Sequence, residues 1–166
     1  VNRQLAVSLD NQRMYVSNRF QVAAYDRKSG VRAWQSPQLP GRVRRAHEWS
    51  LTAMRPVLHG ERIYARQLYG DTTSLVCLDK SNGQPIWNAP HRRNIDIISD
   101  PMIIHDHLVC LTMARTSQLE SVVRFTVFDP ETGTIWHDRD LVTLSNAWQR
   151  RQVCEVQTIR GGMVAV

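Results

Sequence analysis

The chain has 166 residues, of which 42% are hydrophobic and 22% are charged, and its formal net charge is +6. A chain of this length can bury a real core, and this composition is typical of a soluble globular protein. Its longest apolar runs, such as Met102–Ile104 and Leu108–Leu111, are far too short to span a bilayer. The composition therefore argues against a membrane-spanning segment.

The chain repeats one pattern three times: an aspartate, a turn that contains glycine, and a tryptophan. The three copies are Asp26–Trp34, Asp79–Trp87 and Asp129–Trp136. Their glycines, which are Gly30, Gly83 and Gly133, lie 53 and 50 residues apart, and their tryptophans lie 53 and 49 apart. Because several landmarks keep one period, the pattern indicates a structural repeat of about 50 residues.

A second motif repeats out of phase with the first. It consists of an apolar residue, a short polar turn and an apolar run, and it occurs at Leu9–Val16, Leu58–Ala65, Ile104–Cys110 and Ile159–Val166. The turn residues tolerate a positive φ and lie between stretches of β-prone residues. This combination predicts four β-hairpins.

Each repeat is predicted to contain four strands. In the second repeat we expect them at Leu51–Leu58, Glu61–Leu68, Leu75–Leu78 and Gln84–Trp87. Between the last two strands the glycine supplies backbone freedom, and the aspartate can accept hydrogen bonds from the turn amides. We predict a short helix or a loop only at Leu141–Arg151.

Four-stranded antiparallel units at this period are the signature of β-propeller blades. The predicted fold class is therefore all-β, a partial ring of about three blades plus the start of a fourth. We place the blades at approximately 4–40, 50–90 and 97–140, with 152–166 opening the next.

The stretch Ala24–Trp34 resembles the tryptophan-docking motif A-x-D-x-x-T-G-x-x-x-W of PQQ-like (quinoprotein-type) propeller repeats, the BamB-like family. Cys77–Trp87 matches it with Cys for Ala and Asn for Thr. Val127–Trp136 matches with Val for Ala and has one residue fewer after its glycine. The resemblance implies that each tryptophan packs against a neighbouring blade and ties the ring together. On this reading, the motif residues are structural: Trp34, Trp87, Trp136, Gly30, Gly83, Gly133, Asp26, Asp79 and Asp129.

The resemblance also implies a larger ring. Propellers of this family have seven or eight blades, which at ~50 residues each takes roughly 350–400 residues. We therefore expect this chain to be a segment of a longer protein. Its expected binding partners include the remaining blades of its own propeller.

The three cysteines are Cys77, Cys110 and Cys154, and they form no C-x-x-C motif. Each lies in an apolar or alternating stretch, which favours buried free thiols. A disulfide between two of them stays open at this stage.

No residue is assigned to catalysis, to a cofactor or to a metal. The chain shows no Ser-His-Asp order, no P-loop and no Rossmann glycine pattern. His105-Asp106-His107 aligns with the turns of the other hairpins, and two histidines without a third ligand make a poor metal site. We expect no cofactor in this segment; PQQ and Ca²⁺ enter only if the protein is a quinone-dependent dehydrogenase.

Arginine accounts for 19 of the 21 basic residues. Arg42, Arg44, Arg45, Arg92 and Arg93 lie in the connections between predicted blades. These connections could form a positive face for a protein or a polyanionic partner. The competing interpretation is an arginine-rich composition without a site. Nucleic-acid binding is not expected, because the clusters lack interleaved exposed aromatics.

The leading functional hypothesis is a non-catalytic binding or scaffold segment that mediates protein or ligand interaction. The resemblance implies a periplasmic or other extracytoplasmic location. The alternative is a segment of a quinone-dependent dehydrogenase. A third hypothesis is a propeller that serves as the sensor of a fused kinase or protease.

Overall fold

The computed structural model describes residues 4–40, 53–70, 72–89, 95–117 and 119–145, together with the backbone of 156–159 and 162–165. All regular elements among these residues are β-strands. They form three antiparallel sheets and a separate hairpin. The predicted all-β fold class is therefore confirmed. None of the described residues belongs to a helix long and apolar enough to cross a membrane.

The first sheet is a four-stranded meander in chain order. Its strands are β1 (Ala6–Leu9), β2 (Arg13–Ser17), β3 (Val22–Asp26) and β4 (Arg32–Gln35). A register shift between Ala24 and Tyr25 places one extra residue, Ala33, in β4. Such a bulge bends the outer strand and re-aims the side chain that follows it.

The second sheet repeats the same order. Its strands are β5 (Val57–His59), β6 (Arg62–Tyr69), β7 (Thr72–Asp79) and β8 (Pro85–Asn88). Two strands differ from the sequence prediction. β5 starts only at Val57, directly after Pro56, which has no N–H to donate to a ladder. β7 begins at Thr72 because Thr72 pairs with Tyr69 across a tight turn, so the polar start of this strand lies inside the sheet.

The third sheet has five strands and extends further than the other two. Its strands are β9 (Ile95–Ile97), β10 (Met102–Ile104), β11 (His107–Arg115), β12 (Glu120–Phe128) and β13 (Ile135–Ser145). β9 and β10 both pair with β11, so the first strand of this sheet is split in two. The start of Leu141–Arg151 was predicted as helix or loop, and this is wrong for 141–145. These residues continue β13: Val142–Ser145 pairs with Glu120–Val123, and Leu141 is the extra residue of a bulge. The rest of that stretch lies outside the described residues.

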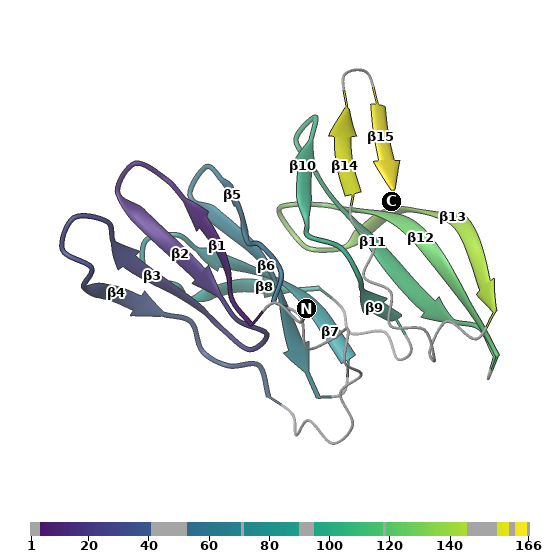
Figure 1. The fold of residues 1–166 in the computed structure, drawn as a ribbon, viewed down its shortest axis with the longest axis horizontal. Helices are drawn as coiled ribbons and strands as arrows, with labels where there is room; N and C mark the ends of the chain where they lie inside the picture. Colours follow the sequence, from purple (N-terminus) through teal and green to yellow (C-terminus); the bar gives the residue numbers. More distant parts are fainter. Residues whose placement is uncertain are drawn as a thin grey trace.

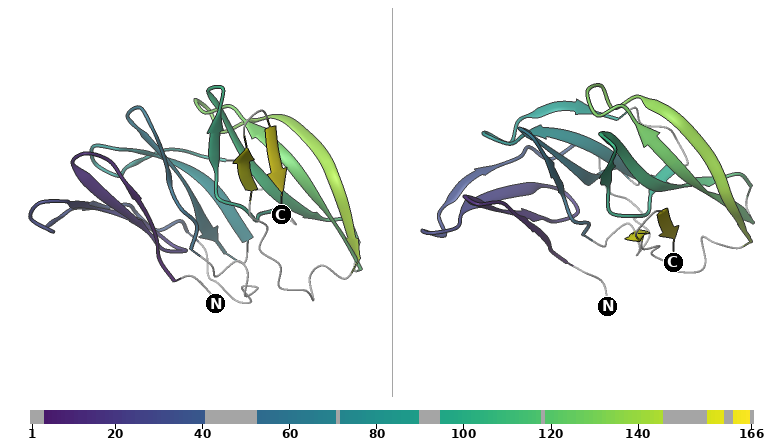
Figure 2. Two further views of the ribbon diagram at one scale, coloured as in Figure 1. Left: turned by 45° about the horizontal axis from the view of Figure 1, so that its top comes forward. Right: turned by 90° about the horizontal axis from the view of Figure 1, so that it is seen from above.

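The hairpin β14 (Val156–Ile159) and β15 (Gly162–Ala165) follows the third sheet. Figure 1 shows the three sheets side by side in chain order, and Figure 2 shows that they fan out as sectors of an arc. The described sheets thus form an open part of a ring. We call them blades 1, 2 and 3.

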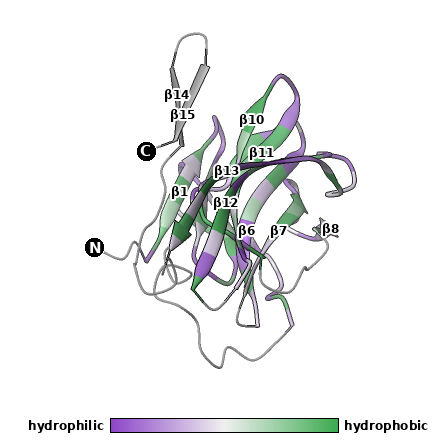
Figure 3. Cartoon of the chain, turned by 90° about the vertical axis from the view of Figure 1, so that its right-hand side faces the viewer, coloured by the Kyte–Doolittle hydropathy of each residue, from purple (hydrophilic) through white to green (hydrophobic). Residues whose placement is uncertain are grey.

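The core lies between neighbouring blades. One cluster joins blades 1 and 2 and consists of Tyr15, Val22, Ala24, Trp34, Ile63, Ala65, Val76 and Leu78. A second cluster joins blades 2 and 3 and consists of Tyr64, Leu75, Cys77, Ala89, Ile97, Leu108, Cys110 and Phe128. Hydrophobic residues follow the strands, while the turns at the strand ends are hydrophilic (Figure 3). Blade 2 thus buries both of its faces, one against blade 1 and one against blade 3.

Two of the three cysteines belong to this core. Cys77 and Cys110 are free and buried, which confirms the predicted free thiols for this pair. Burial raises the pKa of the Cys77 thiol to about 11 and raises the pKa of Cys110 further. Both thiols therefore stay protonated at neutral pH. Cys154 lies outside the described residues.

Candidate functional site

The aspartates of the repeated motif organise the turn before the last strand of each blade. Asp26 accepts hydrogen bonds from the amides of Lys28 and Ser29 and from the Ser29 hydroxyl. These bonds, with the Ser29 amide foremost, lower the pKa of the Asp26 carboxyl. Asp79 and Asp129 make the same kind of turn, and hydrogen bonds also lower their pKa values. The ionised carboxylate therefore holds each turn closed at neutral pH.

The glycines of these turns have a positive φ, and two of them receive a tryptophan. Gly30, Gly83 and Gly133 have φ values of 70°, 74° and 72°. The Trp34 ring of blade 1 lies on Gly83 of blade 2 so closely that an added Cβ would overlap it. Trp87 of blade 2 lies on Gly133 of blade 3 in the same way. Nothing described lies within 4 Å of a Cβ built on Gly30.

Each docked indole is fixed by one hydrogen bond. Trp34 Nε1 donates to the carbonyl oxygen of Lys80 at 3.1 Å, and Trp87 Nε1 donates to that of Pro130 at 3.0 Å. Both acceptors directly follow the motif aspartate of the next blade. The buried indole N–H thus has the partner that it needs, and the bond sets how neighbouring blades align.

In blades 1 and 2, an arginine from the first hairpin donates to the carbonyl oxygen that accepts the indole N–H. Arg13 Nη1 donates to Lys80 at 2.9 Å, and Arg62 Nη1 donates to Pro130 at 2.9 Å. Arg62 also forms an ion pair with Glu131 of blade 3. We call this arrangement the clamp: a tryptophan and an arginine of one blade on one carbonyl of the next. The sequence analysis missed the arginines, although Arg13 and Arg62 occupy the same place in the repeated hairpin motif.

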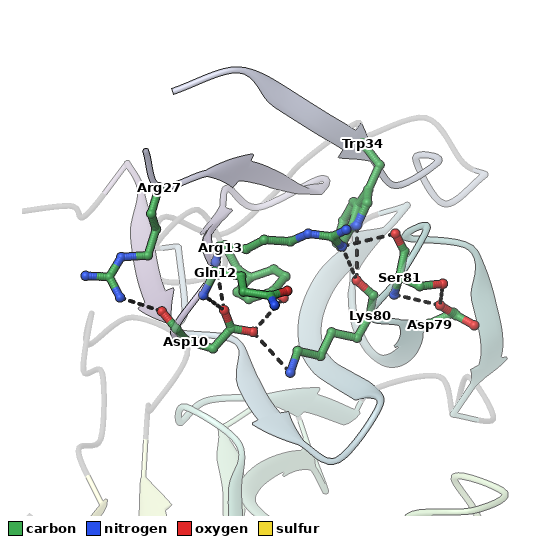
Figure 4. A network of polar contacts seen from close by, with 9 residues as sticks. Asp10, Gln12, Arg13, Arg27, Trp34, Asp79, Lys80 and Ser81 are labelled. Atoms are coloured by element: carbon green, nitrogen blue, oxygen red, sulfur yellow. Dashed lines mark hydrogen bonds and ion pairs between the residues drawn. The ribbon is translucent and has the colours of Figure 1, made fainter. Parts of the chain in front are cut away.

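Asp10 and Lys80 strengthen the clamp between blades 1 and 2 (Figure 4). The Asp10 carboxylate accepts from the amides of Gln12 and Arg13 and from the Tyr15 hydroxyl, and it lies 3.0 Å from Lys80 Nζ. Burial alone would raise the pKa of Asp10, but these hydrogen bonds and Lys80 together lower it well below its usual value. The ion pair is therefore present throughout the neutral range.

Blade 3 departs from this arrangement. In β13 the residue opposite Val127 is His137, whereas Trp34 stands opposite Ala24 and Trp87 opposite Cys77. Because one residue is missing between Gly133 and Trp136, the tryptophan falls on the preceding bulge position.

The resemblance predicts a docking role for Trp136, and this stays a prediction because no turn of a following blade is among the described residues. Within the described residues the Trp136 side chain is 68% exposed. Its ring contacts His107 of its own blade, edge-on, with centroids 4.9 Å apart. His107 begins β11 as Arg13 begins β2 and Arg62 begins β6. Blade 3 therefore presents two histidines at the positions where the other blades present the clamp.

A second polar cluster lies deep between blades 2 and 3. The Asp96 carboxylate accepts hydrogen bonds from the amide and the hydroxyl of Thr73, at 2.9 and 3.2 Å. Arg66 is fully buried and donates to the carbonyl oxygen of Ile97 at 3.1 Å. Burial raises the pKa of Asp96 to about 6, although the Thr73 hydrogen bonds and the charge of Arg66 oppose the rise. The sequence gave no signal that Asp96 is buried, because β9, the strand that holds it, is only three residues long.

The predicted anion-binding residues Arg42, Arg44, Arg45, Arg92 and Arg93 lie outside the described residues. Their role as a partner-binding face stays a prediction. Other described arginines, Arg13 and Arg62, lie instead at the seams between blades.

We expect Trp87→Ala to lower the free energy of unfolding by about 3–5 kcal/mol, because it empties a large buried volume and leaves the Pro130 carbonyl with fewer donors. The matched control is Trp136→Ala, whose side chain is exposed and which should change stability by less than about 0.5 kcal/mol. Urea denaturation of the two variants checks this. Equal losses in both variants would contradict the docking role of Trp87.

Gly83→Ala and Gly30→Ala separate backbone strain from docking. Both positions have a positive φ, so each alanine costs about 1–2 kcal/mol in the turn. Only at Gly83 does the new methyl group also overlap a tryptophan ring, and overpacking should add about 1–3 kcal/mol. We expect Gly83→Ala to melt at a clearly lower temperature than Gly30→Ala. Equal melting temperatures would show that docking of the Trp34 ring does not require a glycine at position 83.

Asp96 predicts a pH dependence of stability. Its folded pKa, about 6, lies above the unfolded value of 3.8, so the folded protein holds the proton more tightly. The stabilisation is complete below pH 4 and is lost as the pH rises to 6 and beyond. We expect the difference in unfolding free energy between the protein and Asp96→Asn to change between pH 4 and 6. A constant difference over that range would refute the assignment.

Comparisons with known proteins agree with this architecture. A family model described as outer membrane protein assembly factor BamB matches residues 7–166. The quinohemoprotein alcohol dehydrogenase of Comamonas testosteroni is similar in structure, with a TM-score of 0.64 and 20% sequence identity over 85% of this chain. Quinohemoprotein alcohol dehydrogenase ADHIIG of Pseudomonas putida HK5 gives a TM-score of 0.62 and 18% identity over 86% of this chain. The comparison with curated proteins found no match.

The chain spans only 22% of the length of either dehydrogenase. At these identities the likeness shows the fold alone. The family match covers nearly the whole chain, and the blades carry its tryptophan-docking turns at both described seams. The chain therefore belongs to the PQQ-like repeat family whose model is described as outer membrane protein assembly factor BamB.

Proposed function

We propose that this chain is a non-catalytic binding or scaffold segment of a larger PQQ-like propeller protein, and that it mediates protein or ligand interaction outside the cytoplasm. The proposal rests on one observation: the described motif residues hold the blades together. At both described seams, tryptophan, arginine and the turn carbonyl hold one blade to the next. These side chains build the ring, so we assign the binding of a protein or ligand to the blade edges and to the connections between blades.

The family description supports the same reading, because the matching model is that of an assembly factor. An assembly factor acts by holding other proteins. A propeller suits this role, since each blade offers an outer edge and loops on a rigid frame.

A second candidate function is a segment of a PQQ-dependent dehydrogenase, which the two similar solved structures favour. PQQ and Ca²⁺ would belong to that function. Within the described ranges, no three His, Cys, Asp or Glu side chains gather closely enough to hold a metal ion. We derive no step through either group.

The two functions are distinguished by assaying the full-length protein. We expect no reduction of an artificial electron acceptor when PQQ, Ca²⁺ and a panel of alcohols are supplied, and no quenching of protein fluorescence by PQQ. A parallel fractionation of cells should place the protein outside the cytoplasm. Acceptor reduction that depends on added PQQ would overturn the scaffold proposal, and recovery in the cytoplasmic fraction would overturn the location.

A further inference from the structure

The turn between β7 and β8 contains the step Asn82–Gly83, which is the only Asn-Gly pair in the sequence. An asparagine loses its side-chain amide most readily before glycine, because glycine has no Cβ to hinder the approach of its backbone nitrogen. The equivalent positions of the other two repeats hold Ser29 and Thr132, which have no amide to lose. Among the described blades, only blade 2 therefore has a tryptophan-docking turn that can undergo this reaction.

The reaction is spontaneous and consumes only water. The Gly83 backbone nitrogen loses its proton and attacks Cγ of Asn82, the side-chain nitrogen leaves as ammonia, and a five-membered succinimide ring forms. Water then opens the ring at either of its two carbonyl groups. One opening gives aspartate. The other gives isoaspartate, in which the main chain runs through the former side chain and is one atom longer.

In the docked turn the Gly83 nitrogen is not available for this attack. Its N–H donates to the carbonyl oxygen of Asp79 at 2.7 Å, and Gly83 is buried. The Trp34 ring occupies the position that a Cβ of Gly83 would take, so this step of the backbone has no room to turn. Asn82, in contrast, is exposed. Water and base therefore reach the side chain, while the nucleophile stays in its hydrogen bond.

Blade 1 holds the rest of the turn in place (Figure 4). The Lys80 carbonyl accepts hydrogen bonds from Trp34 and Arg13. Arg13 also donates to the Ser81 carbonyl at 3.1 Å. The Lys80 Nζ lies 3.0 Å from the Asp10 carboxylate. All of these contacts come from blade 1, so the turn keeps its conformation as long as the seam between blades 1 and 2 is closed.

The modified turn no longer matches the indole. An isoaspartate lengthens the backbone between Asp79 and Gly83, so the hydrogen bond that joins these two residues loses its geometry. The product also places a new carboxylate near that of Asp79, which already accepts hydrogen bonds from the amides of Ser81 and Asn82. Like charges at this spacing repel each other. A seam that has opened and reacted is therefore less able to close again.

We propose that Asn82–Gly83 is a deamidation site that the clamp of blade 1 protects, and that isoaspartate formed there permanently weakens the seam between blades 1 and 2. The rate of the reaction follows the fraction of time for which this seam is open, because local opening frees the Gly83 nitrogen. The chemistry does not depend on what the full propeller binds.

The test follows Asn82 in the full-length protein during incubation in mildly alkaline buffer. Trypsin cleaves after Lys80 and after Arg92, and fragmentation of the released peptide distinguishes asparagine, aspartate and isoaspartate at position 82. We expect the folded protein to deamidate at least about tenfold more slowly than the same protein in guanidinium chloride, since only the open fraction reacts. Equal rates in the two conditions would overturn the proposal.

Two tryptophan variants separate opening of this seam from a general loss of stability. Trp34→Ala removes the ring that covers Gly83 and should speed the reaction of the folded protein at least about tenfold. Trp87→Ala is the matched control, because it removes the equivalent contact between blades 2 and 3, and it should leave the rate nearly unchanged. Equal acceleration in both variants, or none in Trp34→Ala, overturns the clamp as the protecting contact.

Arg13→Gln gives an independent readout if Trp34→Ala does not fold. It removes the arginine from the two turn carbonyls and should speed the reaction several-fold. Its control is Arg32→Gln, since Arg32 is exposed and donates to Gln35 within its own blade. This control should keep the parent rate. The same rate in both arginine variants would contradict the protection by blade 1.

The consequence for the seam is measured on the product itself. Ion exchange separates the isoaspartate form by its new negative charge, and this form should melt at a lower temperature than the unmodified protein. Asn82→Ser, which copies Ser29 of blade 1, should form no product at this position and should keep its melting temperature through the same incubation. An isoaspartate form that melts with the unmodified protein would overturn the weakening of the seam.

Discussion

The structure depends on one contact: an indole that lies on a glycine turn of the next blade and donates to the carbonyl beside it. The three blades are separate sheets, and among the described residues no strand ladder joins them. Besides the backbone bond from the Leu68 amide to the Arg19 carbonyl, side chains therefore fix how each blade sits on its neighbour. A ring atom that lies where a Cβ would be can only face glycine, and the positive φ of the turn also requires glycine. The backbone conformation of the turn and the packing of the indole thus both require glycine at this position.

The arginines at the start of β2 and β6 make this contact directional. Each donates to the carbonyl that already accepts the indole N–H, so two donors from one blade converge on one acceptor of the next. A charged donor strengthens such a bond, and a planar guanidinium holds it in a defined geometry. Part of the chain's arginine content is therefore structural. The histidines of blade 3 make its outward end chemically different from the two described seams.

The seams also explain where binding can occur. Trp34, Trp87 and the clamp arginines are engaged between blades, and the motif aspartates are engaged in their own turns, so these side chains are not free to hold a ligand. The buried cluster of Arg66 and Asp96 is enclosed between blades 2 and 3 in the same way. The described side chains at the seams therefore belong to the frame of the ring.

The sequence by itself determined the blades, since turns and hairpins are local: Asp79 and Gly83 specify their turn wherever it is placed. It also indicated which residues dock, through the spacing of Trp34 and Trp87. Tertiary structure decided the rest, because pairing and burial depend on residues far apart. β13 is a strand to Ser145 only because β12 continues beside it, and Trp136 falls on a bulge because the register of β13 is set by β12. Asp96 is buried because Thr73, from another blade, replaces the water that a carboxylate otherwise needs.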